Sequence, residues 1–377
     1  MKFKTSKFML LMFVSAILFI SANIYTVKAA EVQPDYGIYW YGKGNVSQKF
    51  ESGVPNKYYN PTKPTVIYVH GWQPTCQLLN NRETFNFSDE LLRPVNGADE
   101  WIAKGWNVGT FYWDFFADEI SVTDAEAKIW TSNGPKAMRW LDHNGVYHSY
   151  STAKSVGELF YDNYVQAMKG YQGNEIRIAG HSLGNQMATY LTKRVYDSAD
   201  AGKIAKNLKP TRLALLDPYF SNLGKDYLGG KWTGEVCRGY VSDLKGKGLA
   251  IEAYRSSVVS MGLLGDSNEQ EFAMTSFANL MPLFRVDPVN QHNAAKSIYF
   301  RSFSAPAPVL YDRDILGFYH RISGSGPSAA SSNADILANM KSSCSFQLLT
   351  GAFTMDSKDN GYVKLDRNSI IPVVPIN

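Results

Sequence analysis

The sequence feature that most constrains this chain is the segment Gly180-His181-Ser182-Leu183-Gly184, which lies between a run typical of a strand and a pattern typical of a helix. In that context G-x-S-x-G forms a nucleophile elbow, a sharp turn that exposes a serine hydroxyl at the carboxyl end of a sheet. The same letters also occur by chance, with the serine simply capping a helix. The flanking patterns favour the elbow, with Ser182 as the nucleophile.

Short apolar, often β-branched runs predict four buried strands, at 65–70, 106–114, 175–180 and 212–217. Apolar residues recur at helical spacing over 156–171, before the third strand, and over 187–195, after it. Strands that alternate with helices favour a mostly parallel sheet covered by helices on both faces. Together with the elbow, this order predicts the α/β-hydrolase fold.

The length and composition suit one large globular domain, because 45% of the 377 residues are apolar and only 19% are charged.

Residues 1–29 combine a basic start, an apolar stretch and small residues near the end, which predicts a cleaved signal peptide and secretion. An uncleaved anchor helix is the alternative. We expect residues 30–321 to form the catalytic domain. Residues 322–377 should form a Gly/Ser-rich loop and an extension packed on that domain, with 322–333 typical of a linker or mobile loop.

Charge and cysteine content predict neither a nucleic-acid partner nor a metal. The formal charge of +4 includes Lys2, Lys4 and Lys7 at the start of the predicted signal peptide, and no run of Lys or Arg lies elsewhere. The three cysteines allow one disulfide at most, and their spacing resembles no metal cluster. We therefore expect no cofactor.

A serine nucleophile needs a histidine base and an acid that orients it, and in this fold the chain order is Ser, then Asp or Glu, then His. Asp217 ends the fourth predicted strand, directly before Pro218, which places its carboxylate at the same sheet edge as Ser182. A turn-forming role is the alternative for this aspartate. Both His292 and His320 follow it, and chain order alone leaves the choice between them open.

An acyl-transfer site also needs two backbone N–H groups for the oxyanion of the tetrahedral intermediate. We expect one from Leu183, directly after the nucleophile. The other should come from Trp72, because Gly71 lets the chain turn tightly after the strand at 65–70. A simple strand-terminating turn is the alternative for His70-Gly71-Trp72.

Several of these segments together resemble the pancreatic-lipase-like family of animal lipases and phospholipases A1: VIYVHGW, NVGTFYWD, IRIAGHSLG, LALLDP and QHNAAKSIYFRS. The resemblance runs from about residue 65 to residue 303. It implies a triad of Ser182, Asp217 and His292 and an oxyanion hole formed by Trp72 and Leu183. It therefore favours His292 over His320 as the base.

Two departures from this family affect the expected substrate. Only Cys237 lies between Asp217 and His292, so a lid closed by a disulfide is not expected. Too few residues follow His292 for the lipid-binding β-sandwich of the pancreatic enzymes, and no obligate protein cofactor is expected. Apolar residues at 272–284 and 115–150 could bind acyl chains or contact a lipid surface, although for most of them packing on the core is the better interpretation.

The leading hypothesis is therefore a secreted serine ester hydrolase that cleaves carboxylic esters of lipids through an acyl-enzyme. The alternatives are an esterase of short soluble esters, a phospholipase A1, or an inactive lipid-binding homologue. Retention of serine, acid and histidine argues against the inactive homologue, because binding alone does not need all three.

Overall fold

The computed structural model describes residues 33–89, 91–262, 265–280 and 282–367. The chain's large compact unit begins at Pro34. The predicted signal peptide at 1–29 lies outside the described residues. Among the helices in the described ranges, none has the length and apolar character needed to cross a bilayer.

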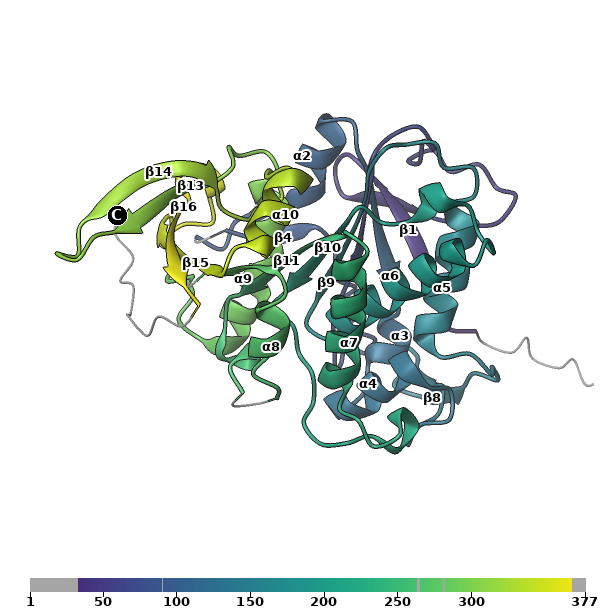
Figure 1. Cartoon of the computed structure of the whole chain (residues 1–377). Coiled ribbons are helices and arrows are strands. Elements are labelled where there is room, and N and C mark those ends of the chain that lie inside the picture. Colours follow the sequence, from purple (N-terminus) through teal and green to yellow (C-terminus); the bar gives the residue numbers. More distant parts are fainter. Residues whose placement is uncertain (1–32, 90, 263–264, 281, 368–377) are drawn as a thin grey trace, which may run out of the picture. The chain divides into compact units, whose positions relative to one another are not determined.

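A large sheet forms the centre of the fold (Figure 1). Its twelve strands are β1 (Gly37–Gly42), β2 (Val46–Lys49), β3 (Thr65–Val69), β6 (Asn107–Tyr112), β9 (Ile176–His181), β10 (Arg212–Leu216), β11 (Ala250–Arg255), β12 (Ser276–Asn279), β13 (Val309–Arg313), β14 (Tyr319–Ser325), β15 (Cys344–Thr350) and β16 (Gly361–Asp366). They lie in the order β14-β13-β16-β15-β12-β11-β10-β9-β3-β6-β1-β2. The run from β15 to β6 is parallel throughout, and the outer strands add antiparallel pairs.

Helices cover both faces of this sheet. The α-helices are α2 (Gly97–Ala103), α3 (Asp114–Ala117), α4 (Val122–Trp130), α5 (Val156–Ala167), α6 (Gly184–Asp200), α7 (Thr233–Gly246), α8 (Glu269–Phe272), α9 (Pro288–Ser302) and α10 (Asn333–Lys341). Short 3-10 turns are η1 (Lys206–Leu208), η2 (Asp226–Leu228), η3 (Val258–Ser260) and η4 (Ser357–Asp359), and two small hairpins are β4–β5 (Asn86–Ser88, Pro94–Asn96) and β7–β8 (Arg139–Leu141, Tyr147–Ser149).

The two faces of the sheet carry two separate apolar cores. Along β3, Ile67 packs in the core that includes α5, α6 and α7, whereas Val66 packs in the core that includes α2 and α9. This alternation follows from the two-residue period of a strand, and the strand is buried on both faces because helices cover both. The prediction of an α/β fold with a mostly parallel sheet between helices is confirmed.

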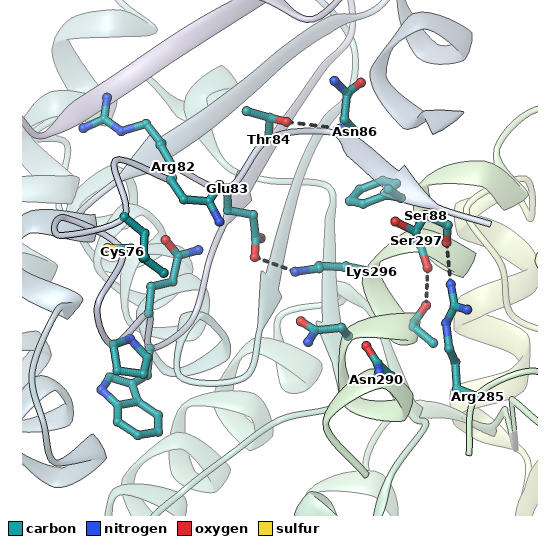
Figure 2. A pocket seen from close by; sticks show the side chains of 18 residues that line it. Cys76, Arg82, Glu83, Thr84, Asn86, Ser88, Arg285, Asn290, Lys296 and Ser297 are labelled. Carbon is teal, nitrogen blue, oxygen red and sulfur yellow. Dashed lines mark hydrogen bonds and ion pairs between the residues drawn. The ribbon is translucent and has the colours of Figure 1, made fainter. Parts of the chain in front are cut away.

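Most apolar residues of the two loop regions pack on the core, as expected. Phe116 and Trp140 are buried in the 115–150 region, and Phe272 and Leu280 are buried before α9. Leu283 remains exposed. At the carboxyl edge of the sheet, the segments after β3 and β12 enclose a polar cavity (Figure 2).

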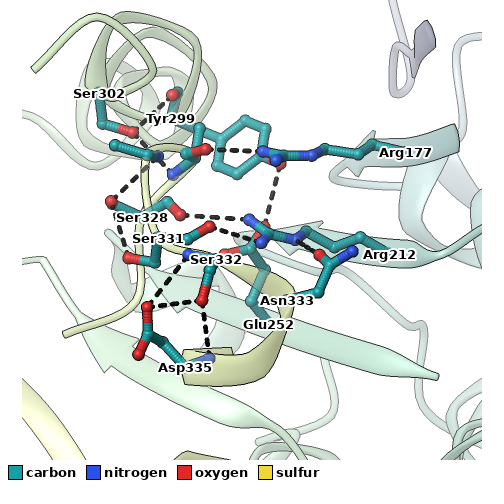
Figure 3. A network of polar contacts seen from close by, with 12 residues as sticks. Arg177, Arg212, Glu252, Tyr299, Ser302, Ser328, Ser331, Ser332, Asn333 and Asp335 are labelled. Carbon is teal, nitrogen blue, oxygen red and sulfur yellow. Dashed lines mark hydrogen bonds and ion pairs between the residues drawn. The ribbon is translucent and has the colours of Figure 1, made fainter. Parts of the chain in front are cut away.

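The Gly/Ser-rich segment is not a linker, which corrects the expectation for 322–333. Its first residues belong to β14, and Ser328, Ala329 and Ser331 are almost fully buried. Arg177 donates to the carbonyl of Ala329 (2.6 Å) and Arg212 to that of Ser331 (2.5 Å), as Figure 3 shows. Composition was misleading here because small side chains also allow a backbone to approach buried arginines closely.

The buried charge of Arg212 is balanced within this network. Arg212 lies 3.5 Å from Glu252 of β11, which also accepts hydrogen bonds from Tyr254 and Tyr299. Arg212 and Glu252 are fully buried, and a buried charge without a partner would cost several kcal/mol. The segment from Ser328 to Ser331 is therefore part of the packed structure.

Candidate active site

The elbow at Ser182 has the backbone geometry that the sequence predicts. β9 ends at His181 and α6 begins at Gly184. Between them, Ser182 has a φ of 55°, in the left-handed region that residues other than glycine rarely adopt. A Cβ on Gly184 would lie 2.2 Å from the carbonyl oxygen of Val69, and one on Gly180 would lie 2.4 Å from that of Gly184. Only glycine fits at either position, so strand and helix can meet at this sharp turn.

Asp217 follows β10 directly beside the elbow. Leu216 pairs with His181 across the parallel strands, so the next residues, Asp217 and Ser182, lie at the same edge of the sheet. The Asp217 carboxylate is fully buried and accepts hydrogen bonds from His292 Nδ1 (2.6 Å), Ser260 Oγ (2.8 Å), the Ser257 hydroxyl and the Ser256 N–H (2.9 Å). The acid is thus held in one orientation.

These donors keep Asp217 ionised. Burial by itself raises the pKa of this carboxyl group, but the hydrogen bonds and charge from His292 and the donors at Ser257 and Ser256 outweigh burial, so its pKa lies below the usual value. An ionised acid at the Nδ1 side of an imidazole orients the ring and stabilises the imidazolium.

His292 lies in the second turn of α9. Asp287 caps this helix by accepting from the Asn290 N–H, and Pro288 occupies its first turn, which fixes where the helix begins. The His292 ring lies against the ring of His181, with 4.4 Å between centroids, and His181 Nε2 donates to the His292 carbonyl (2.9 Å). The base is therefore held both through its ring and through its backbone.

His181 does not compete as a base. Burial, together with the nearby charges of His292 and Lys296, holds its pKa well below the ordinary histidine value, so the ring is neutral and serves as a donor. The other candidate base, His320, lies exposed on β14 and contacts Asp314 (2.8 Å). Of the two histidines that chain order left open, the structure brings His292, and not His320, to Asp217.

Among the described residues, no hydrogen bond joins the Ser182 hydroxyl to the His292 ring. In enzymes without substrate, such a bond is often long and shortens only in the complex. The structure thus places all three candidate residues at one sheet edge and directly joins two of them.

The turn after β3 lies against the nucleophile. A Cβ on Gly71 would lie 2.6 Å from the Ser182 Cβ, so only glycine permits this approach. Neither the Trp72 N–H nor the Leu183 N–H donates a backbone hydrogen bond within the described ranges, which leaves both donors free for an oxyanion. The Trp72 indole donates to the Glu119 carbonyl (2.6 Å), and the buried His70 ring contacts the Gly71 carbonyl (2.9 Å). Both contacts hold the turn in place.

A cavity of about 450 Å³ adjoins this turn and α9 (Figure 2). Twelve of its 18 lining residues have polar or charged side chains, which is unlike the apolar groove that a long acyl chain needs. Two contacts join its walls. Lys296 Nζ lies 2.5 Å from Glu83 Oε2, and Arg285 donates to the carbonyls of Ser88 and Asp89 (2.7 Å each).

Sequence reasoning missed several of these residues. Lys296 could have been found, because it lies one helical turn after His292 and therefore on the same face of α9. Ser257 and Ser260 carried no signal, because the strand β11 before them was not predicted.

Cys76, Cys237 and Cys344 are free thiols. In the described ranges no group of three or more His, Cys, Asp or Glu side chains could hold a metal ion.

A scan against family models found none that matches the chain, and a search of curated proteins returned no match either.

Proposed function

We propose that the chain is a serine ester hydrolase of the α/β-hydrolase fold, similar to the pancreatic-lipase-like family, that cleaves carboxylic esters of lipids. The observation that carries this proposal is the hydrogen bond from His292 to the buried Asp217 beside the strained elbow at Ser182. Secretion, predicted from residues 1–29, belongs to the same proposal.

In the proposed reaction, Ser182 Oγ attacks the ester carbonyl while His292 Nε2 takes its proton. Asp217 stabilises the imidazolium at Nδ1, and the N–H groups of Trp72 and Leu183 bind the oxyanion. The tetrahedral intermediate then breaks its bond to the alcohol oxygen, which receives the proton from His292. Water attacks the acyl-enzyme in the same way and releases the acid and free Ser182.

Exposed apolar side chains on the surrounding loops support a lipid ester as substrate. The loops that follow β3, β6, β10, β11 and β12 carry Leu78, Leu79, Ile120, Leu223, Met261 and Leu283, all of them exposed. Apolar groups on this edge could contact a lipid surface. The polar cavity beside Trp72 favours the second candidate, an esterase of soluble esters.

Ser182→Ala tests the proposal, with Ser342→Ala, a serine distant in sequence, as the matched control. Purified protein should hydrolyse p-nitrophenyl octanoate and react covalently with a fluorophosphonate at Ser182, located by peptide mass spectrometry. The Ser182 variant should lose about a million-fold in turnover and all labelling while its circular dichroism stays unchanged. Labelling at another serine, or substantial turnover in the variant, would refute the assignment.

A further inference from the structure

The polar cavity adjoins the helix that carries the base and the turn that carries the oxyanion donor, although neither Ser182 nor His292 lines it. In acyl transfer the histidine protonates the alcohol oxygen as it departs, so the alcohol lies beside the base. The cavity shares its wall with the base helix, since Asn293, Ala294 and Lys296 of α9 line it, and Trp72 lines it at the oxyanion turn. A leaving group that extends along α9 from an ester at Ser182 would therefore enter this cavity.

The charges in this cavity are mostly neutralised by neighbouring groups. Lys296 pairs with Glu83, and Arg82 pairs with both Asp35 and Asp114. Arg285 already donates to two backbone carbonyls. Arg285 alone has no acidic partner among the described residues, so two of the cavity's three cations are neutralised, which favours a neutral ligand over an anion.

Neutral polar groups remain available. Asn81 and Asn86 are exposed, and their side-chain amides have no hydrogen-bond partner in the part of the chain that the structure describes. Asn290 and Asn293 use their amide N–H groups locally, on Asp287 and Val289, and keep side-chain oxygens that can accept. A lining that both donates and accepts matches hydroxyl groups, which also do both.

We propose that this cavity is a subsite for the leaving group, and that it takes a neutral alcohol with several hydroxyl groups, such as a sugar or another polyol. The inference rests on the proposed function, because it assumes an ester at Ser182. It predicts that acyl esters of polyols are better substrates than esters of simple alcohols with the same acyl chain.

Three octanoyl esters test the proposal, each below its solubility limit: those of methyl glucoside, methanol and glycerol 3-phosphate. The glucoside ester should have the highest kcat/KM, by at least about tenfold over the methyl ester, which corresponds to one or two added hydrogen bonds. An equal or better methyl ester would overturn the subsite, and a preference for the phosphate ester would overturn its neutral character. Failure of all esters, p-nitrophenyl octanoate included, would instead refute the proposed hydrolase function.

Substitutions in the cavity lining test whether the preference for the glucoside ester arises there. Asn81→Leu and Asn86→Leu, made separately, keep the side-chain size but remove the amide. At least one should lower the ratio of kcat/KM for the glucoside ester over the methyl ester about threefold to tenfold. Asn174→Leu, an exposed position before β9 at the opposite sheet edge, is the matched control and should leave the ratio unchanged. Equal ratios in all variants would refute the assignment.

Discussion

Removal of the Ser257 hydroxyl should measurably destabilise the protein through Asp217. This hydroxyl donates to the fully buried carboxylate, and a hydrogen bond to a charged group contributes about 1.5 to 3 kcal/mol. We expect Ser257→Ala to lower the free energy of unfolding by about 2 kcal/mol at pH 7. Equilibrium urea unfolding, followed by tryptophan fluorescence, measures this difference.

The neighbouring serine supplies a matched control. Ser256 holds Asp217 through its backbone N–H, while its own buried hydroxyl has no hydrogen-bond partner in the structure. Ser256→Ala therefore keeps the contact and removes an unsatisfied polar group, so the free energy of unfolding should stay the same or rise slightly. Equal losses in the two variants would refute the argument.

The loss of unfolding free energy caused by Ser257→Ala should also depend on pH, in a direction that can be stated. The native pKa of Asp217 lies below that of the unfolded chain, so the ionised carboxyl stabilises the fold at neutral pH. This contribution is lost as the pH falls through the native pKa. Because Ser257→Ala raises the native pKa toward the unfolded value, the difference from the unmodified protein should be largest near neutral pH and shrink in acid. A difference that grows in acid would contradict the proposed contact.

The remaining predictions concern the acid, the base and the ion pair across the cavity. Asp217→Asn should lower kcat about ten-thousand-fold on p-nitrophenyl octanoate, whereas His320→Ala should leave kcat unchanged; the reverse pattern would move the base to β14. Lys296→Met leaves Glu83 largely buried without its cation and should cost about 3 kcal/mol of unfolding free energy in urea. Lys358→Met removes an exposed pair and should cost less than about 0.5 kcal/mol, so a similar loss in both would disprove the role of the buried pair.

Patterns that are local in the chain predicted much of the fold. The runs that became β3, β6, β9 and β10 are continuous and apolar because those strands are buried on both faces. Strand β11 was not predicted, because Glu252 interrupts its apolar run. That glutamate can be buried because Arg212 of β10 and Tyr299 of α9 reach it from other elements, and Tyr254 donates to it from the same strand.

In the candidate site, too, the residues marked by local sequence were predicted, and those fixed by long-range contacts were not. Ser182 and Asp217 are marked by their immediate neighbours in sequence, a glycine on each side of the elbow and a proline after the acid. The choice between His292 and His320 depends on which ring reaches Asp217, which order along the chain does not reveal. The polar cavity was not predicted, because its walls come from two segments about 200 residues apart.

The arginine network in Figure 3 also limits how early during synthesis the protein can complete its folding. Arg177 and Arg212 reach acceptors that lie 152 and 119 residues further along the chain. A nascent chain that has exposed Glu252 but not yet Ser331 has the acidic partners of both arginines, Glu175 and Glu252, but lacks these carbonyl acceptors, at a cost of about 1.5 to 3 kcal/mol for each missing hydrogen bond. The strands around the nucleophile should therefore stay loosely packed until the last tenth or so of the chain emerges, because contacts this distant close late. If the chain is exported, as proposed, it would in this way stay unfolded enough for translocation during most of its synthesis.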